Sequence, residues 1–200
     1  RVESSSRLDV IRTIRPFIDS DESPEKSALF HNTNAGKNLL SLDLTKPEGK
    51  AVALDLVRWC DVVTESFSPK AMKAFGLDYE SLLEVNSDLI MLSTCLFGQT
   101  GPLSMFAGYG NLAAAIAGFY TITGWPDREP AGPFGAYTDY IAPRYNAAAI
   151  LAALDHRDRA GEGQHIDLAQ AESAMHFLTP AILDYMANDK VQLRMGNSDP

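Results

Sequence analysis

Residues Leu89-Ile90-Met91-Leu92-Ser93 form a short, continuous apolar run, which is typical of a β-strand covered by protein on both faces. Two runs upstream, Leu40–Leu44 and Asp61–Glu65, also have strand character. Between these runs, apolar residues recur at helical spacing over 51–59 and 79–85. Because strands that alternate with helices indicate a parallel sheet, the sequence predicts an α/β fold in which the three runs are parallel strands.

Local signals predict where several helices begin and end. Thr45-Lys46-Pro47-Glu48 has the form of a capping box, and Asp78 is a typical residue to precede a helix. Gly161 permits a left-handed exit from a helix, and strand character resumes over Gln164–Leu168. The other predicted helices are Gly108–Thr121, Tyr140–Arg159, which Pro143 interrupts early, and Ala169–Ala187.

The composition of the 200 residues is that of a soluble, folded protein. Seventeen Lys and Arg against 26 Asp and Glu give a net charge of -9, which repels the phosphates of nucleic acids. The longest apolar runs, Leu112–Tyr120 and Ala147–Leu154, fall short of the ~20 residues that span a bilayer. Two cysteines, with no targeting segment in Arg1–Ser4, indicate a reducing compartment. We therefore expect a cytoplasmic protein with neither nucleic-acid nor membrane partners.

Several other catalytic patterns have little support. The four histidines lack the spacing of a zinc helix, so no metal site is predicted. Cys95 is interpreted as a packed residue, because no partner for a thiol mechanism is evident. Gly108-Tyr109-Gly110-Asn111-Leu112-Ala113 fits the dinucleotide pattern G-x-G-x-x-A, although no strand leads into it. An NAD-dependent oxidoreductase is therefore a distant alternative.

Asp139 is the carboxylate most suited to chemistry. Gly135-Ala136-Tyr137-Thr138 leads into it at the start of an expected helix, where backbone N–H groups stabilise an anion. A carboxylate whose pKa is raised moderately by burial is still largely ionised at pH 7, so it can attack without a separate base. The competing interpretation is an ordinary helix N-cap, since Asp is among the commonest capping residues. The spacing alone leaves both interpretations open.

Four stretches follow one another over nearly the whole chain: Asn34–Lys37 with Ser41–Leu44, then Asp61–Phe67, Phe97–Pro102 and Ile150–Asp167. Together they resemble the family III CoA-transferases, the group of the formyl-CoA and carnitine CoA-transferases. The resemblance implies a Rossmann-like parallel sheet, incomplete in this chain, and an interlocked homodimer of the full-length protein. It also implies that residues 1–190 are a large, CoA-binding domain without its first strand and its C-terminal part. Residues 191–200 then begin a linker to a small domain.

Asp139 matches the nucleophilic aspartate of that family. The resemblance therefore implies transfer of CoA from an acyl-CoA donor to a carboxylate acceptor, through a mixed anhydride and an aspartyl-CoA thioester on Asp139. Neighbouring N–H donors stabilise each oxyanion in such a mechanism. Coenzyme A enters as part of a substrate, and no tightly bound cofactor is implied.

The resemblance also implies CoA-binding positions, which are Lys37, Leu42, Thr45, Ser66, Phe67 and Tyr109. Leu42 and Thr45 match the adenosine site, Ser66 and Phe67 match an Asn-Phe pair beside it, and Tyr109 matches a tyrosine near the thioester. Lys37 is a candidate on the phosphate side. Structural alternatives are strand core for Leu42, a helix cap for Thr45, packing for Phe67 and a surface charge for Lys37.

Some positions depart from the family pattern. Ala74 stands where many members carry a CoA-binding arginine, Ala107 replaces a lysine of formyl-CoA transferase, and Gly110 stands where an acid is frequent. Lys73 is adjacent to Ala74, but adjacent helical residues point about 100° apart. Tyr109 occupies the place of the proton-transferring histidine of the related α-methylacyl-CoA racemases, which argues against racemisation. A non-catalytic half of a fused or heteromeric transferase is a further alternative.

Overall fold

The computed structural model describes residues 1–198, and two residues of the predicted linker, 199 and 200, lie outside the described residues. The chain divides into two compact units, Arg1–Arg58 and Trp59–Pro200. The boundary between the two units, after Arg58, thus falls inside the predicted large domain of residues 1–190.

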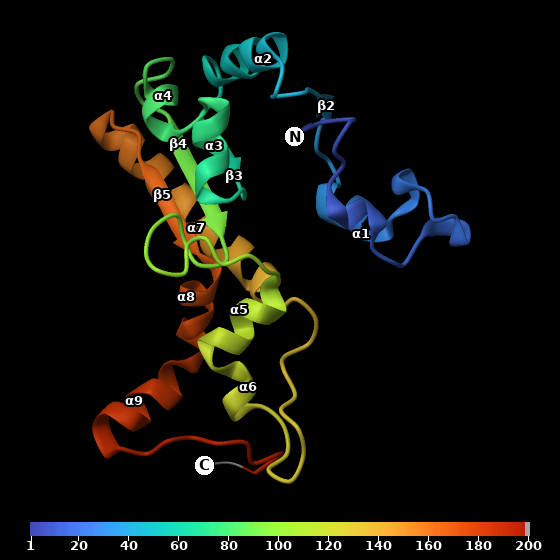
Figure 1. Cartoon of the computed structure of the whole chain (residues 1–200). Helices are drawn as coiled ribbons and strands as arrows, with labels where there is room; N and C mark the ends of the chain where they lie inside the picture. The colour runs from blue at the N-terminus through green and yellow to red at the C-terminus, as the bar shows by residue number, and fades with distance from the viewer. Residues whose placement is uncertain (199–200) are drawn as a thin grey trace. The chain divides into compact units, whose positions relative to one another are not determined.

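The first unit contains a two-stranded parallel sheet, short 3-10 turns and two helices (Figure 1). Its elements are β1 (Val2–Glu3), η1 (Val10–Thr13), η2 (Ile18–Ser20), η3 (Pro24–Lys26), α1 (Ala28–Asn34), β2 (Leu40–Ser41) and α2 (Pro47–Val57). Strand β1 pairs with β2 through Val2 opposite Leu40 and Glu3 opposite Ser41.

The second unit contains a three-stranded parallel sheet with the order β3-β4-β5 (Figure 1). The strands are β3 (Val62–Glu65), β4 (Ile90–Cys95) and β5 (His165–Ala169). The helices are α3 (Pro69–Phe75), α4 (Tyr79–Leu83), α5 (Gly110–Ala117), α6 (Phe119–Ile122), α7 (Tyr137–Ala160), α8 (Gln170–Met175) and α9 (Thr179–Asn188), with the 3-10 turn η4 (His176–Leu178). The predicted α/β class with parallel strands is confirmed.

Strand β4 is central in its sheet and is the most buried strand. Leu89, just before it, and Ile90 are fully buried, and Met91 and Leu92 are 2% exposed. This burial explains the continuous apolar run, because a central parallel strand has protein on both faces. Helix α7 packs along β4 and β5, and its Arg157 forms an ion pair of 2.8 Å with Asp61, which precedes β3.

The predicted strand Leu40–Leu44 is shorter than expected and belongs to the separate sheet of the first unit. The chain turns at Asp43, whose carboxylate accepts the backbone N–H of Thr45 at 3.0 Å and the Thr45 hydroxyl at 2.6 Å. These bonds end the extended segment after Ser41. The capping box is also wrong, since Lys46 is the N-cap of α2, with Pro47 at its first turn, and the Thr45 hydroxyl is engaged by Asp43.

Two predicted helices are interrupted in the structure. Gly118, at φ 104°, ends α5 in the left-handed region, and α6 starts anew at Phe119. The helix expected over Ala169–Ala187 is divided into α8, η4 and α9, and Pro180 lies in the first turn of α9. Asp78 and Gly161, by contrast, cap α4 and α7 as predicted.

Small residues bring α5, α7 and α8 close together. Their shared core contains Ala114, Ala117, Phe119, Ile141, Ala174 and Leu178. Alanine is small and allows helix axes to approach closely. The first turns of α5, α7 and α8, which begin at Gly110, Tyr137 and Gln170, therefore lie next to one another. This junction positions Asp139.

Candidate active site

Asp139 lies in the first turn of α7 and is half-buried. The N-cap is Ala136, so the interpretation of Asp139 as an N-cap is wrong, as is a helix start at Tyr140. The backbone N–H of Asp139 donates to the Ala136 oxygen at 3.0 Å. The side chain is therefore free to interact outside its own helix, while the amino end of α7 still favours its negative charge.

The N–H of Gly110 donates to Oδ2 of Asp139 at 3.1 Å. Gly110 can approach this closely because it has no side chain: a Cβ there would lie 2.8 Å from the Ala136 oxygen and 2.8 Å from the Asp139 nitrogen. The departure at Gly110 thus has a steric reason, since an acidic side chain cannot be accommodated without moving the start of α7.

Thr138 and Gln170 complete the cluster. Thr138 is fully buried, and its hydroxyl lies 3.1 Å from Oε1 of Gln170 and 3.3 Å from the Gly110 oxygen. Hydrogen bonding with the side chain of Gln170 is one of the effects that lower the pKa of Asp139. Asp139 is therefore held by the start of α5, and the Gln170 side chain at the start of α8 lies beside it through Thr138.

Burial raises the pKa of Asp139 above the ordinary aspartate value, and the hydrogen bonds from Gly110 and Gln170 oppose this rise. A desolvated carboxylate is less well stabilised than one in water, and it is a better nucleophile while it stays ionised. Gly110 N–H is also placed to stabilise an oxyanion that develops on the Asp139 carboxyl group.

Tyr109 precedes Gly110 and is the N-cap of α5, with 62% of its surface exposed. It is therefore next in the chain to the residue that holds Asp139, and its ring is accessible to a ligand. Ala107 is exposed in the loop before it.

Ser66 and Phe67 lie just beyond the carboxyl end of β3, an edge at which parallel sheets commonly bind ligands. The carboxylate of Glu65, which is buried, accepts the N–H of Phe67 at 2.7 Å. The ring of Phe67 meets Phe75 of α3 edge-on at 6.0 Å, and 47% of the residue remains exposed. Ala74, on the same helix, is exposed.

Lys37, Leu42 and Thr45 belong to the first unit. The ammonium group of Lys37 donates to the Thr33 oxygen at 2.8 Å and to Oδ1 of Asn34 at 3.2 Å, at the carboxyl end of α1. Leu42 follows β2 and donates its N–H to the Glu3 oxygen at 3.0 Å. Both Lys37 and Thr45 are exposed.

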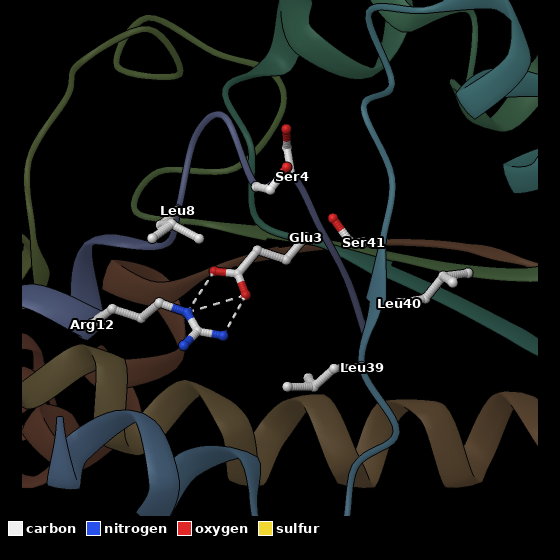
Figure 2. Close-up of a pocket in the computed structure, with 8 residues that line it drawn as sticks. Glu3, Ser4, Leu8, Arg12, Leu39, Leu40 and Ser41 are labelled. Carbon is white, nitrogen blue, oxygen red and sulfur yellow. Dashed lines mark hydrogen bonds and ion pairs between the residues drawn. The ribbon is translucent and has the colours of Figure 1, made fainter. Parts of the chain in front are cut away.

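A cavity of about 220 Å³ lies in the first unit (Figure 2). Its lining is formed by Glu3, Ser4, Ser5, Leu8, Arg12, Leu39, Leu40 and Ser41. Arg12 points at Glu3 in Figure 2 and forms an ion pair of 2.8 Å with it. Because these charges neutralise one another, we assign no chemistry to this cavity.

The sequence indicated Asp139 but missed Thr138 and Gln170. Gln170 directly follows β5, and a polar residue at the carboxyl end of a parallel strand is a signal that could have indicated it. Thr138 gave no such signal, since a hydroxyl beside a carboxylate is common in helix starts. Within residues 1–198, no cluster of His, Cys, Asp and Glu suited to a metal ion is present.

Comparisons with known proteins show the family of the chain. A sequence model described as CoA-transferase family III matches residues 1–200. The chain belongs to this family. Among its family III relatives, succinate–glutarate CoA-transferase of Agrobacterium fabrum is 41% identical over 186 residues, which are 92% of this chain and 46% of the relative. Acetyl-CoA:oxalate CoA-transferase of Acetobacter aceti is 33% identical over 201 residues, which are 100% of this chain and 50% of the relative.

A crystal structure of a CaiB/BaiF family protein from Brucella suis superposes with a TM-score of 0.91 at 38% identity and covers 100% of this chain and 52% of that one. The family III chain thus spans about half the length of the relatives that it matches. The dinucleotide pattern at Gly108 lacks its structural context, since β4 ends at Cys95 and a loop leads to α5. In the described part of the chain, no helix is long and apolar enough to cross a bilayer.

Proposed function

We propose that the whole protein is an acyl-CoA:carboxylate CoA-transferase whose nucleophile is Asp139. The observation that carries the proposal is a half-buried carboxylate held by Gly110 N–H at the meeting point of three helix starts. Family membership supports it, since the relatives with printed functions are CoA-transferases.

The proposed reaction begins when the Asp139 carboxylate attacks the carbonyl carbon of the donor acyl-CoA. The C–S bond breaks, which gives a mixed anhydride and CoA thiolate. The thiolate then attacks the Asp139 carbonyl carbon of the anhydride, which releases the donor carboxylate and leaves an aspartyl-CoA thioester. Gly110 N–H would stabilise the oxyanion formed on Asp139 in this step.

The acceptor carboxylate reverses these steps. It attacks the thioester carbonyl, CoA thiolate leaves, and a second mixed anhydride forms. The thiolate attacks the acceptor's carbonyl carbon, which yields the new acyl-CoA and regenerates the Asp139 carboxylate. No net proton transfer is needed, which fits a cluster in which no basic side chain contributes to the pKa shift of Asp139.

Lys37, Leu42, Thr45, Ser66, Phe67 and Tyr109 are proposed to contribute to CoA binding. The exposed faces of Phe67 and Tyr109 support this for the second unit, since an adenine ring or a thioester chain can pack on them. The names of the relatives, which print succinate, glutarate and oxalate, support small dicarboxylates as the acceptor class.

The test uses the full-length protein with Asp139→Asn and, as a matched control, Asp158→Asn on the exposed face of α7. Acetyl-CoA and succinyl-CoA serve as donors, with oxalate and glutarate as acceptors. We expect Asp139→Asn to abolish turnover, and hydroxylamine trapping followed by mass spectrometry to find a donor-dependent adduct on Asp139 of the parent. A folded Asp139→Asn variant with normal transfer would overturn the proposal.

A further inference from the structure

Gln170 is fixed in place by the elements on either side of it. It is the first residue of α8 and directly follows β5. Its neighbours Ala169 and Ala171 are 7% and 3% exposed, and the Ala171 N–H donates to the Leu96 oxygen at 3.0 Å. The side chain therefore leaves an anchored strand–helix junction, which limits where its amide can lie.

Thr138 determines which way the Gln170 amide faces. The hydroxyl of Thr138 donates toward Oε1 of Gln170 at 3.1 Å, and it shares its proton with the Gly110 oxygen at 3.3 Å. A buried hydroxyl that donates to the amide oxygen leaves the amide N–H₂ group for the other neighbour, which is Asp139. An amide in the opposite orientation would place its oxygen against a carboxylate, with no proton between them.

We propose that Gln170 is a positioning residue for Asp139: its amide, oriented by Thr138, acts with Gly110 N–H to hold the carboxylate in one orientation for attack on acyl-CoA. This rests on the proposed function of Asp139 and adds a residue to it. Gly110 binds Oδ2 from the start of α5, and Gln170 approaches from the start of α8. Two donors from different elements restrict rotation of a carboxylate more than one donor does.

Charged groups near Asp139 do not account for its pKa. The other ionisable groups on the packed elements are Tyr109 before α5, Glu172 on α8, His176 in η4 and, along α7, Tyr137, Tyr140, Arg144, Tyr145, Asp155, His156, Arg157, Asp158 and Arg159. None of them contributes to the pKa shift of Asp139: burial raises this pKa, and hydrogen bonding with Gly110 and Gln170 lowers it. Loss of the Gln170 donor should therefore be visible in the titration of Asp139.

The experiment compares full-length parent, Gln170→Met and Thr138→Val. Methionine keeps the length of the side chain without a donor, and valine keeps the shape of threonine without the hydroxyl. In Gln170→Met we expect the Asp139 carboxyl ¹³C titration and the acid limb of adduct formation to move to higher pH by about one unit. The acyl-CoA KM should stay unchanged while kcat falls about tenfold near the foot of that limb. Thr138→Val should move both in the same direction by less.

Gln164→Met is the matched control, because Gln164 lies before β5 and outside the Asp139 cluster. It should leave both titrations unchanged. A folded Gln170→Met variant with the parent's Asp139 titration would overturn the inference, even if the parent forms the adduct. A shifted titration in a protein that forms no adduct would support the Gln170 contact and overturn the proposed function instead.

Discussion

At the scale of single residues, the absence of a side chain at Gly110 decides the geometry of the candidate nucleophile. The hydrogen bond from Gly110 to Asp139 requires a backbone approach that any Cβ would block at 2.8 Å. Glycine in the first turn of a helix lowers helix stability, so its presence at this position fits a requirement for close contact.

Gly110→Ala should therefore displace Asp139. We expect a destabilisation of about 1–3 kcal/mol from the forced shift and a loss of transferase activity of at least about tenfold. Gly161→Ala, at the other end of α7, is the control: its Cβ has open space but a φ of 73°, so it should cost about 1 kcal/mol and leave activity intact. Urea unfolding and turnover are measured for both, and an active, fully stable Gly110→Ala would contradict this view.

Burial of Asp139 also predicts a pH-dependent stability change. Because its folded-state pKa is raised, the ionised carboxylate opposes folding at neutral pH, and this cost is absent below the ordinary value of 3.8. Asp139→Asn should therefore unfold no more easily than the parent at pH 7, within about 1 kcal/mol, and any gain should disappear as pH falls toward 3.8. Thermal unfolding at several pH values checks this. If Asp139→Asn were less stable than the parent at neutral pH only, the result would contradict this prediction.

At the scale of elements, the buried Arg12 forms ion pairs that join β1, η1 and η3. The guanidinium of Arg12, which is 4% exposed, bonds both oxygens of Glu3 and also Glu25, and it lies 3.5 Å from the centre of the Phe30 ring. The hydrogen bonds from Arg12 lower the pKa of Glu3 below 4.5, against the opposing effect of burial.

Arg12→Met should cost about 2–3 kcal/mol, because the partly buried Glu3 carboxylate loses its strongest partner and keeps only the Asp9 N–H and the more distant Arg1. The parent's contribution from Glu3 is present above pH 4.5 and is lost as pH falls through the lower folded-state pKa. Arg15→Met removes the exposed pair of Arg15 with Glu22 and should cost less than about 1 kcal/mol. Denaturant unfolding at pH 7 and pH 3 measures the loss of stability in both variants. An equal loss in Arg12→Met and Arg15→Met would contradict the role given to Arg12.

A second link between elements holds the loop after β4. Both carboxylate oxygens of Asp167, on β5, lie 2.9 Å from the Gln99 nitrogen, and they are the nearest atoms to a Cβ built at Gly98. Asp167→Ala should speed hydrogen exchange at the Gln99 amide and destabilise the fold by about 1–2 kcal/mol. Asp158→Ala, which changes an exposed carboxylate on α7, should do neither. Unchanged exchange at Gln99 would show that the loop is held by other contacts.

At the scale of the whole molecule, the contacts separate the chain after Arg58, between α2 and β3. Trp59, the next residue, is 74% exposed. Boundaries between compact units are preferred sites of proteolysis because few contacts restrain the chain there. Trypsin should cut the folded protein after Arg58, which follows the end of α2, earlier than after Arg157, which lies inside α7. Arg58→Gln should remove the early product, and equal cleavage at both sites would contradict the division.

The sequence by itself determined what depends on local periodicity and on single-residue conformational preferences. The apolar run at Leu89–Ser93, the cap at Asp78 and the left-handed exit at Gly161 were all predicted correctly, because each depends on neighbours within a few positions. Asp139 could be singled out as a carboxylate near a helix start, but its exact place in the first turn could not.

Only the tertiary structure decided what surrounds Asp139 and which strands pair. Gly110 and Asp139 are 29 positions apart, and Thr138 and Gln170 are 32 apart. No local pattern specifies that these helix starts meet; the packing of alanine-rich helix faces on a parallel sheet does. Strand β2 likewise pairs with β1 in its own sheet because long-range backbone hydrogen bonds, which leave no periodic signal, determine strand partners.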